Sequence, residues 1–290
     1  MIASLVRIAA SLYREDRSLL WTALGCFGLG GVCLAAMAVA GPVVEPEGHL
    51  FKAATFDIAL GIFLLTLGLI VPSAGFSERG RRRWRRLLIA MVIYVLAVEN
   101  IQIFRGLDPR FSRVGSDLDR LVGGLFFFSA LGIFIAFLIL SARFFFRPTT
   151  GEGGVLVLAL RYGTVASVAA FFVGITMSLH QGPGVGAAGN LLPLHAAGFH
   201  GLQAVPLVAL LLTWAGTSSD LSRRAVHLAG LAWLTACAAT AWQSFGGRSV
   251  LEVSPATVLA VLALAVWAFL FLRAALTFRR GGTWPVSLTA

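Results

Sequence analysis

Residues 121–142 read LVGGLFFFSALGIFIAFLILSA, a run of 22 residues without a charged side chain. A helix needs about 20 apolar residues to cross the roughly 30 Å hydrocarbon core of a bilayer. Because backbone polar groups must be hydrogen-bonded inside the hydrocarbon, this run predicts a transmembrane helix. Seven further apolar runs occur in the chain. The eight predicted spans are 19–40, 52–72, 87–104, 121–142, 155–180, 191–215, 225–244 and 256–277.

The composition of the 290-residue chain agrees with this prediction. Hydrophobic residues make up 58% and charged residues 12%, whereas soluble domains carry about 25% charged residues. These values exclude a soluble globular enzyme and predict an all-α integral membrane protein. The three cysteines, Cys26, Cys33 and Cys237, lie within apolar runs without a metal-binding spacing, so we interpret them as packing residues.

The net charge of +10 predicts an orientation in the membrane. A basic chain can indicate nucleic-acid binding, but here the basic residues lie between apolar runs, so we expect no nucleic-acid partner. Sixteen basic residues fall on the side of the N-terminus, and six fall on the other side. The six are Lys52, Arg105, Arg110, Arg113, Arg120 and Arg248. We therefore predict a multi-pass protein of the cytoplasmic (inner) membrane of a bacterial-type cell, with both termini in the cytoplasm.

The chain is predicted to have four parts. Residues 1–18 carry apolar side chains at helical spacing opposite arginines, which predicts an amphipathic segment on the cytoplasmic membrane surface. Residues 19–147 and 148–280 each hold four spans. Residues 281–290 form a cytoplasmic tail.

The two four-span parts carry similar sequences. Residues 41–50 and 182–191 share five of ten identities at an offset of 141, and residues 102–106 align with 243–247 at the same offset. Residues 52–57 align with 195–200 after two extra residues. Because each part has an even number of spans, these matches predict two parallel four-helix repeats, with a site at the interface between them.

Polar residues of the spans gather in the predicted outer half of the membrane. Polar groups within spans are costly and often functional. The candidates are Asp57, Glu99, Gln102, His180, His195, His200, Gln203 and Gln243. We predict that Asp57, Glu99, Gln102, His195, His200 and Gln243 lie in one connected cluster that opens outward.

Two arginines after the third span could contact an anion. Arg105 and Arg110 lie in a predicted outer loop and could hold a carboxylate, a lipid head group or a haem propionate. Pairing with Asp108, Asp117 and Asp119 of the same region is the alternative.

Three functions fit these observations. The first is a redox-type protein in which His180, His195 or His200 binds haem or a divalent metal. The second is a small-molecule or ion permease, although the outer polar cluster shows no polar path inward except at Arg161. The third is a non-catalytic subunit that contacts a membrane protein partner or forms a homo-oligomer.

The predicted architecture is similar to that of haem A synthase, which also has two four-helix halves and both termini in the cytoplasm. The paired histidines and the Glu-x-x-His-Arg motif of that family have no counterpart in this sequence. The similarity therefore implies a membrane topology but no ligand residues.

Overall fold

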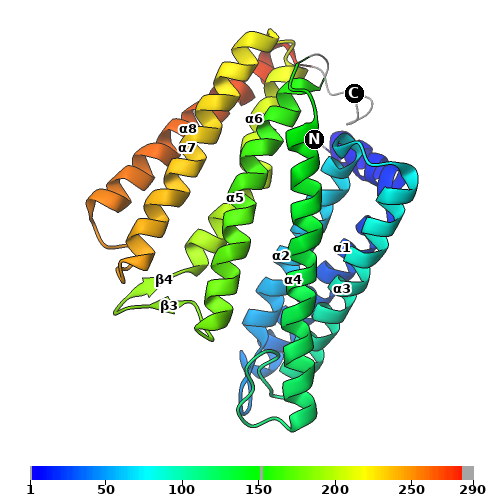
Figure 1. Cartoon of the computed structure of the whole chain (residues 1–290), viewed down its shortest axis with the longest axis vertical. Helices are drawn as coiled ribbons and strands as arrows, with labels where there is room; N and C mark the ends of the chain where they lie inside the picture. The colour runs from blue at the N-terminus through cyan, green and yellow to red at the C-terminus, as the bar shows by residue number, and fades with distance from the viewer. Residues whose placement is uncertain (1, 151–152, 283–290) are drawn as a thin grey trace. The chain divides into compact units, whose positions relative to one another are not determined.

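The computed structural model describes residues 2–150 and 153–282 (Figure 1). Within these ranges, eight helices are long and apolar enough to cross a membrane, which confirms the prediction of a multi-pass helical membrane protein. The chain divides into two compact units, Met1–Ile139 and Leu140–Ala290. Large apolar side chains such as Trp21, Leu125 and Phe172 are exposed, as contact with lipid requires.

The elements follow one another without long connections. They are α1 (Ile2–Ala40), β1 (Val43–Val44), β2 (Gly48–His49), α2 (Leu50–Ile70), the 3₁₀ helix η1 (Val71–Ala74), α3 (Glu78–Phe104), α4 (Asp117–Phe146), α5 (Gly154–Leu179), β3 (Gly184–Val185), β4 (Gly189–Asn190), α6 (Leu192–Trp214), α7 (Ser219–Phe245) and α8 (Pro255–Gly281).

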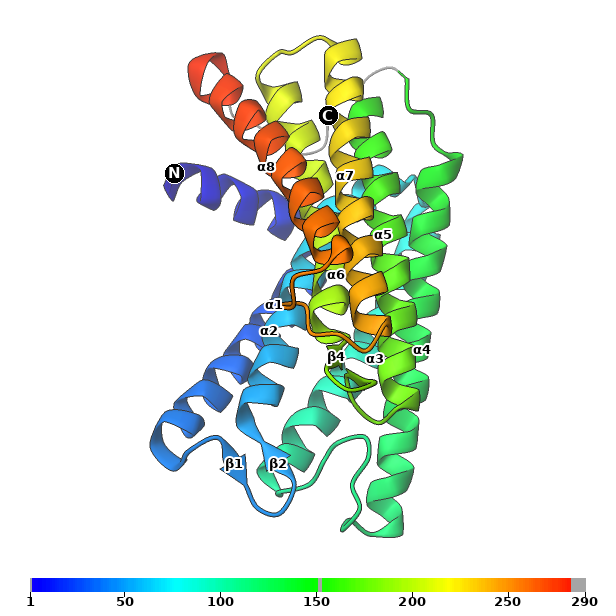
Figure 2. The same cartoon turned by 90° about the vertical axis from the view of Figure 1, so that its left-hand side faces the viewer.

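Helix α1 bends at Asp16, where the backbone leaves the helical conformation. One carboxylate oxygen of Asp16 accepts a hydrogen bond from the Leu19 N–H, and the other pairs with Arg85 of α3 at 3.1 Å. Figure 2 shows the N-terminal part of α1 turning away from the membrane-spanning part. Most side chains of the apolar stripe predicted within residues 1–18 lie outside the described ones, as do residues 283–290 of the predicted tail.

Helix α3 begins nine residues before the predicted span at 87. The Ser77 side chain caps the helix by accepting from the Gly80 N–H, and Glu78 pairs with Arg81 at 3.0 Å. The prediction was based on apolar runs, which mark only the part of a helix that lies in the hydrocarbon. The first turns of α3 are rich in arginine, and the cap keeps them helical in water. The helix therefore extends beyond the bilayer core.

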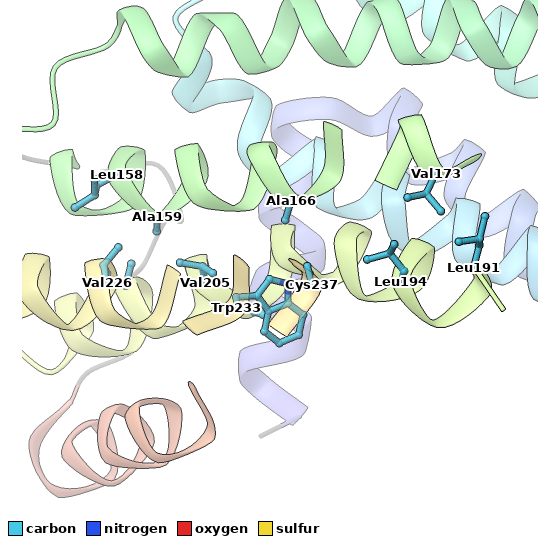
Figure 3. Packing of buried hydrophobic residues seen from close by; sticks show 12 residues of the cluster. Leu158, Ala159, Ala166, Val173, Leu191, Leu194, Val205, Val226, Trp233 and Cys237 are labelled. Carbon is cyan, nitrogen blue, oxygen red and sulfur yellow. The ribbon is translucent and has the colours of Figure 1, made fainter. Parts of the chain in front are cut away.

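The second unit is built on close contact between α5 and α6. A Cβ atom on Gly198 of α6 would approach the Ala166 carbonyl oxygen to 2.8 Å, and one on Gly201 would approach the Ala166 Cβ to 2.7 Å. Such small residues let helix backbones approach closely. Figure 3 shows the apolar core of this unit, with the Trp233 indole of α7 among side chains of α5 and α6. The Trp233 Nε1–H donates to the Ala197 carbonyl at 3.0 Å.

Each unit also contains a two-stranded antiparallel hairpin between its first two helices, which the prediction of purely helical structure missed. Val43 pairs with His49 in one hairpin, and Gly184 pairs with Asn190 in the other. The labels β1 and β2 in Figure 2, and β3 and β4 in Figure 1, mark them. Strands of two residues are too short to leave an alternating pattern in the sequence.

The backbone hydrogen bonds around the two hairpins correspond at an offset of 141 residues. The Glu47 N–H donates to the Gly106 carbonyl at 2.8 Å, and the Ala188 N–H donates to the Gly247 carbonyl at 2.9 Å. The bonds Leu50 N–H to Pro42 O and Leu191 N–H to Pro183 O correspond in the same way. Each hairpin is therefore fastened to the end of the third helix of its own unit.

Candidate functional site

Three side chains form a buried polar chain across α1, α2 and α3 of the first unit. The Asn100 amide Nδ2 donates to Asp57 Oδ1 at 3.1 Å and to the Leu96 carbonyl at 2.9 Å. The Cys33 thiol donates to Asn100 Oδ1 at 3.3 Å. Asp57 and Cys33 are fully buried, and Asn100 is 6% exposed. The cysteines are buried as predicted, but Cys33 also takes part in this polar contact.

The second carboxylate oxygen of Asp57, Oδ2, is buried without a hydrogen-bond partner among the described residues. Burial of a carboxylate away from water is costly unless the group is paired or neutralised. Such an oxygen can take up a proton or bind a cation, and either event removes the cost. Among the predicted site residues in the described part of the chain, Asp57 is the one with a buried side-chain oxygen that lacks a hydrogen-bond partner.

A second buried carboxylate, that of Glu99, lies one residue before Asn100 on α3. Glu99 Oε2 pairs with a guanidinium nitrogen of Arg110 at 2.5 Å. The Glu99 side chain is 2% exposed and that of Arg110 35% exposed. The guanidinium carbon lies 5.3 Å from the ring centroid of Phe56 on α2 and 4.9 Å from that of Phe126 on α4. The two rings and the carboxylate thus surround one cation.

Gln102 and Arg105 close the C-terminal end of α3 against α4. Gln102 Nε2 donates to Asp119 Oδ1 at 3.0 Å, and Arg105 pairs with the same oxygen at 2.6 Å. Asp119 Oδ2 also accepts from the Ser116 hydroxyl and N–H, which caps the start of α4. Arg105 therefore has the partner that the alternative interpretation expects, a carboxylate of its own region.

The loop that carries Arg110 is fastened to the first hairpin by Glu47. Its carboxylate accepts from the Ser112 hydroxyl at 2.6 Å and from the Arg113 N–H at 2.9 Å. These hydrogen bonds, the Ser112 bond first, hold the pKa of Glu47 below its usual range. Asp108 shapes the same loop by accepting from the Arg110 and Phe111 N–H groups, both at 2.9 Å.

The predicted histidines belong to the second unit. His195 of α6 is half-buried, and its Nδ1–H donates to the Ala170 carbonyl of α5 at 2.8 Å. His200 is exposed, and its Nδ1–H donates to Gln203 Oε1 at 3.3 Å. His180 is exposed at the end of α5. The described residues contain no group of three His, Cys, Asp or Glu side chains placed to hold a metal ion.

Gln243 of α7 has a complete set of partners inside the second unit. Its Nε2 donates to the carbonyls of Ser249 and Glu252, at 2.8 and 3.2 Å, and its Oε1 accepts from the Ser254 hydroxyl at 2.6 Å. These bonds fasten the loop before α8 to α7, as Gln102 links the first turn of α4 to α3 through Asp119. The geometry indicates a structural role for both glutamines.

Arg161 of α5, which lies within the predicted span 155–180, binds the end of α4. Its guanidinium donates to the carbonyls of Phe144, Phe145 and Arg147, at 3.1, 3.2 and 2.8 Å. The last carbonyls of a helix lack partners within the helix. The charge of Arg161 is thus engaged in closing a helix end.

The predicted site residues therefore form several local groups. Asp57 is linked to Asn100, Glu99 to Arg110, and Gln102 to Arg105 and Asp119. His200 is linked to Gln203. Sequence reasoning missed Asn100, although the polar sequence at 99–102 ending the third span was a usable signal.

Comparisons of this chain with protein-family profiles, curated proteins and solved structures give no match.

Proposed function

We propose that the protein is a membrane permease for a cation, with Asp57 and Glu99 of the first unit as the binding carboxylates. The observation that carries the proposal is the buried Oδ2 atom of Asp57, which has no partner in the described part of the chain. Ionisable groups inside membrane helices commonly mark ion and proton pathways. Two neighbouring carboxylates favour positively charged substrates over anions.

The contacts of Asn100 support this role. Its amide holds Asp57 Oδ1 in place, so that the second carboxylate oxygen, Oδ2, also has a defined position. Asn100 and Glu99 are neighbours on α3. The same turn of α3 therefore carries the Glu99 carboxylate and the amide that holds the Asp57 carboxylate of α2. A cation at Asp57 would give the buried Oδ2 oxygen a partner.

Flux into liposomes tests the permease proposal. Vesicles with the purified protein and an inside-negative potential should take up protons, sodium or methylammonium faster than protein-free vesicles. Asp57→Asn should reduce the uptake at least tenfold, because it removes the charge and keeps the size. Asp117→Asn is the matched control, since the Asp117 side chain is 95% exposed and pairs only with Arg120 among the described residues. Equal uptake with and without protein, or full activity in Asp57→Asn, would overturn the proposal.

We also propose that the two units arose as parallel repeats. The matching hairpins, the backbone bonds at an offset of 141 residues and the paired roles of Gln102 and Gln243 support this origin. The left-handed Gly106 and Gly247, with φ of +75° and +73°, occupy corresponding places after their third helices.

The proposed location is the cytoplasmic membrane, with both termini inside. The excess of arginines on the side of the N-terminus supports this orientation, above all the six between Arg79 and Arg86 at the start of α3.

Haem binding through one histidine is the second candidate function. His200 supports it because its ring is exposed and its Nε2 has no partner among the described residues. One axial imidazole is sufficient to hold haem iron. An absorbance spectrum of the reduced, purified protein without a haem band would exclude this candidate.

A further inference from the structure

We infer that Glu99, Phe56 and Phe126 form a binding site for an organic cation of the guanidinium or alkylammonium class, and that Arg110 occupies this site as a built-in ligand. The inference rests on the proposed cation permease and names the class of its substrate. Three helices supply the site, with Phe56 from α2, Glu99 from α3 and Phe126 from α4. The cation comes from the loop between α3 and α4.

The site has the composition of a cation receptor. The rings of Phe56 and Phe126 lie 5.9 Å apart and are tilted by 44°. A cation within about 6 Å of an aromatic centroid is attracted by the ring, and more strongly when it is removed from water. The Arg110 guanidinium satisfies this condition for both rings and also meets a nearly buried carboxylate.

The pair differs from an ordinary surface ion pair in its unequal burial. Exposed pairs contribute little, because water screens both charges. Here the Glu99 carboxylate is buried among helices, whereas the Arg110 side chain is 35% exposed. Removal of Arg110 alone would leave a buried carboxylate without its cation, which is strongly unfavourable. A second cation of similar shape can therefore replace Arg110 without a change in the charge of the site.

The loop has a fold of its own that would survive such an exchange. Asp108 binds two backbone N–H groups of the loop, and Glu47 fastens Ser112 and Arg113 to the hairpin. Only the side chain of Arg110 has to leave the rings. The Arg110 side chain would then be displaced from the Glu99 carboxylate by the incoming cation.

Chemical rescue tests the inference. In detergent, Arg110→Ala should lower the thermal midpoint, and guanidinium or methylguanidinium chloride should raise it again in a saturable manner. Half-saturation is expected at roughly 1–10 mM, the range for a ligand of about four non-hydrogen atoms. Sodium chloride at the same concentration should not raise the thermal midpoint of Arg110→Ala. The double variant Arg110→Ala with Glu99→Gln should not respond, because the carboxylate is gone.

Two further variants keep the result decisive. Arg110→Gln retains most of the apolar stem and should show the same guanidinium response if the alanine variant does not fold. Arg113→Ala removes an exposed arginine of the same loop and should show none. Absence of rescue in both Arg110 variants, or equal rescue after Glu99→Gln, would overturn the inference. Rescue without any flux in liposomes would keep the site and reject the permease, whereas Asp57-dependent flux without rescue would do the reverse.

Discussion

Asn100 connects the polar interior of the first unit, since a single amide contacts α1, α2 and its own helix. It donates to Asp57, donates to the Leu96 carbonyl and accepts from Cys33. An amide has two donors and a carbonyl acceptor, so these three bonds use each part of it. Buried polar networks of this kind hold one arrangement of side chains, because any other leaves polar atoms unpaired.

At the same scale, Glu47 predicts a pH dependence of stability. Its pKa is lower in the folded protein than in an unfolded chain, so its hydrogen bonds stabilise the fold above the usual glutamate value of about 4.3 and are lost as the pH falls through the lower folded value. Glu47→Gln should lower the thermal midpoint at pH 7. The difference from the unchanged protein should shrink steadily below about pH 4. A difference that stays constant from pH 7 to pH 3 would contradict this assignment.

The hairpins pack against the C-terminal ends of the third helix of each unit. Gly48 of β2 lies against the Ile103 carbonyl at the end of α3, and Gly189 of β4 lies against the Ser244 carbonyl at the end of α7. In both units the backbone of the hairpin packs on the backbone of a helix end. Only glycine lets the two chains approach so closely.

Alanine at either glycine should therefore destabilise the protein. A Cβ on Gly48 would lie 2.5 Å from the Ile103 carbonyl oxygen, and one on Gly189 would overlap the Ser244 carbonyl oxygen. We expect each substitution to cost about 1–3 kcal/mol, as overpacking does in a tight core. Gly28→Ala is the control, because a Cβ there meets no atom within 4 Å and alanine favours a helix. Thermal unfolding in detergent gives the stability of all three variants. An unchanged stability of Gly48→Ala would contradict the prediction, because it would show that the hairpin can move to accommodate the methyl group.

The proposed topology predicts which loops face the outside of the cell. Single cysteines at Ala187, in the turn of the second hairpin, and at Ser218, before α7, are both at exposed positions. In a variant without its native cysteines, a membrane-impermeant maleimide added to intact cells should label Ala187→Cys and spare Ser218→Cys. Permeabilised cells should label both. The opposite pattern would reverse the orientation.

The sequence was sufficient for the spans because long apolar runs have few alternatives in a bilayer. The sequence did not predict the start of α3, because the charged first turns of this helix lie outside the hydrocarbon and contain no apolar run. Residues 57, 99 and 102 could be selected because polar groups in spans are rare. Their partners Asn100, Arg110 and Asp119 could not be assigned, because each bond joins positions 11 to 43 residues apart whose approach depends on helix packing.

The contact of Arg161 has a consequence for biosynthesis. Helix α4 is synthesised before α5, and until residue 161 is added the carbonyls of Phe144, Phe145 and Arg147 lack the guanidinium that binds them. A nascent chain that stops near residue 150 would therefore hold an unfinished helix end at the lipid boundary. Because residue 161 follows α4 in the chain, this closure of the helix end can form only after synthesis has reached Arg161.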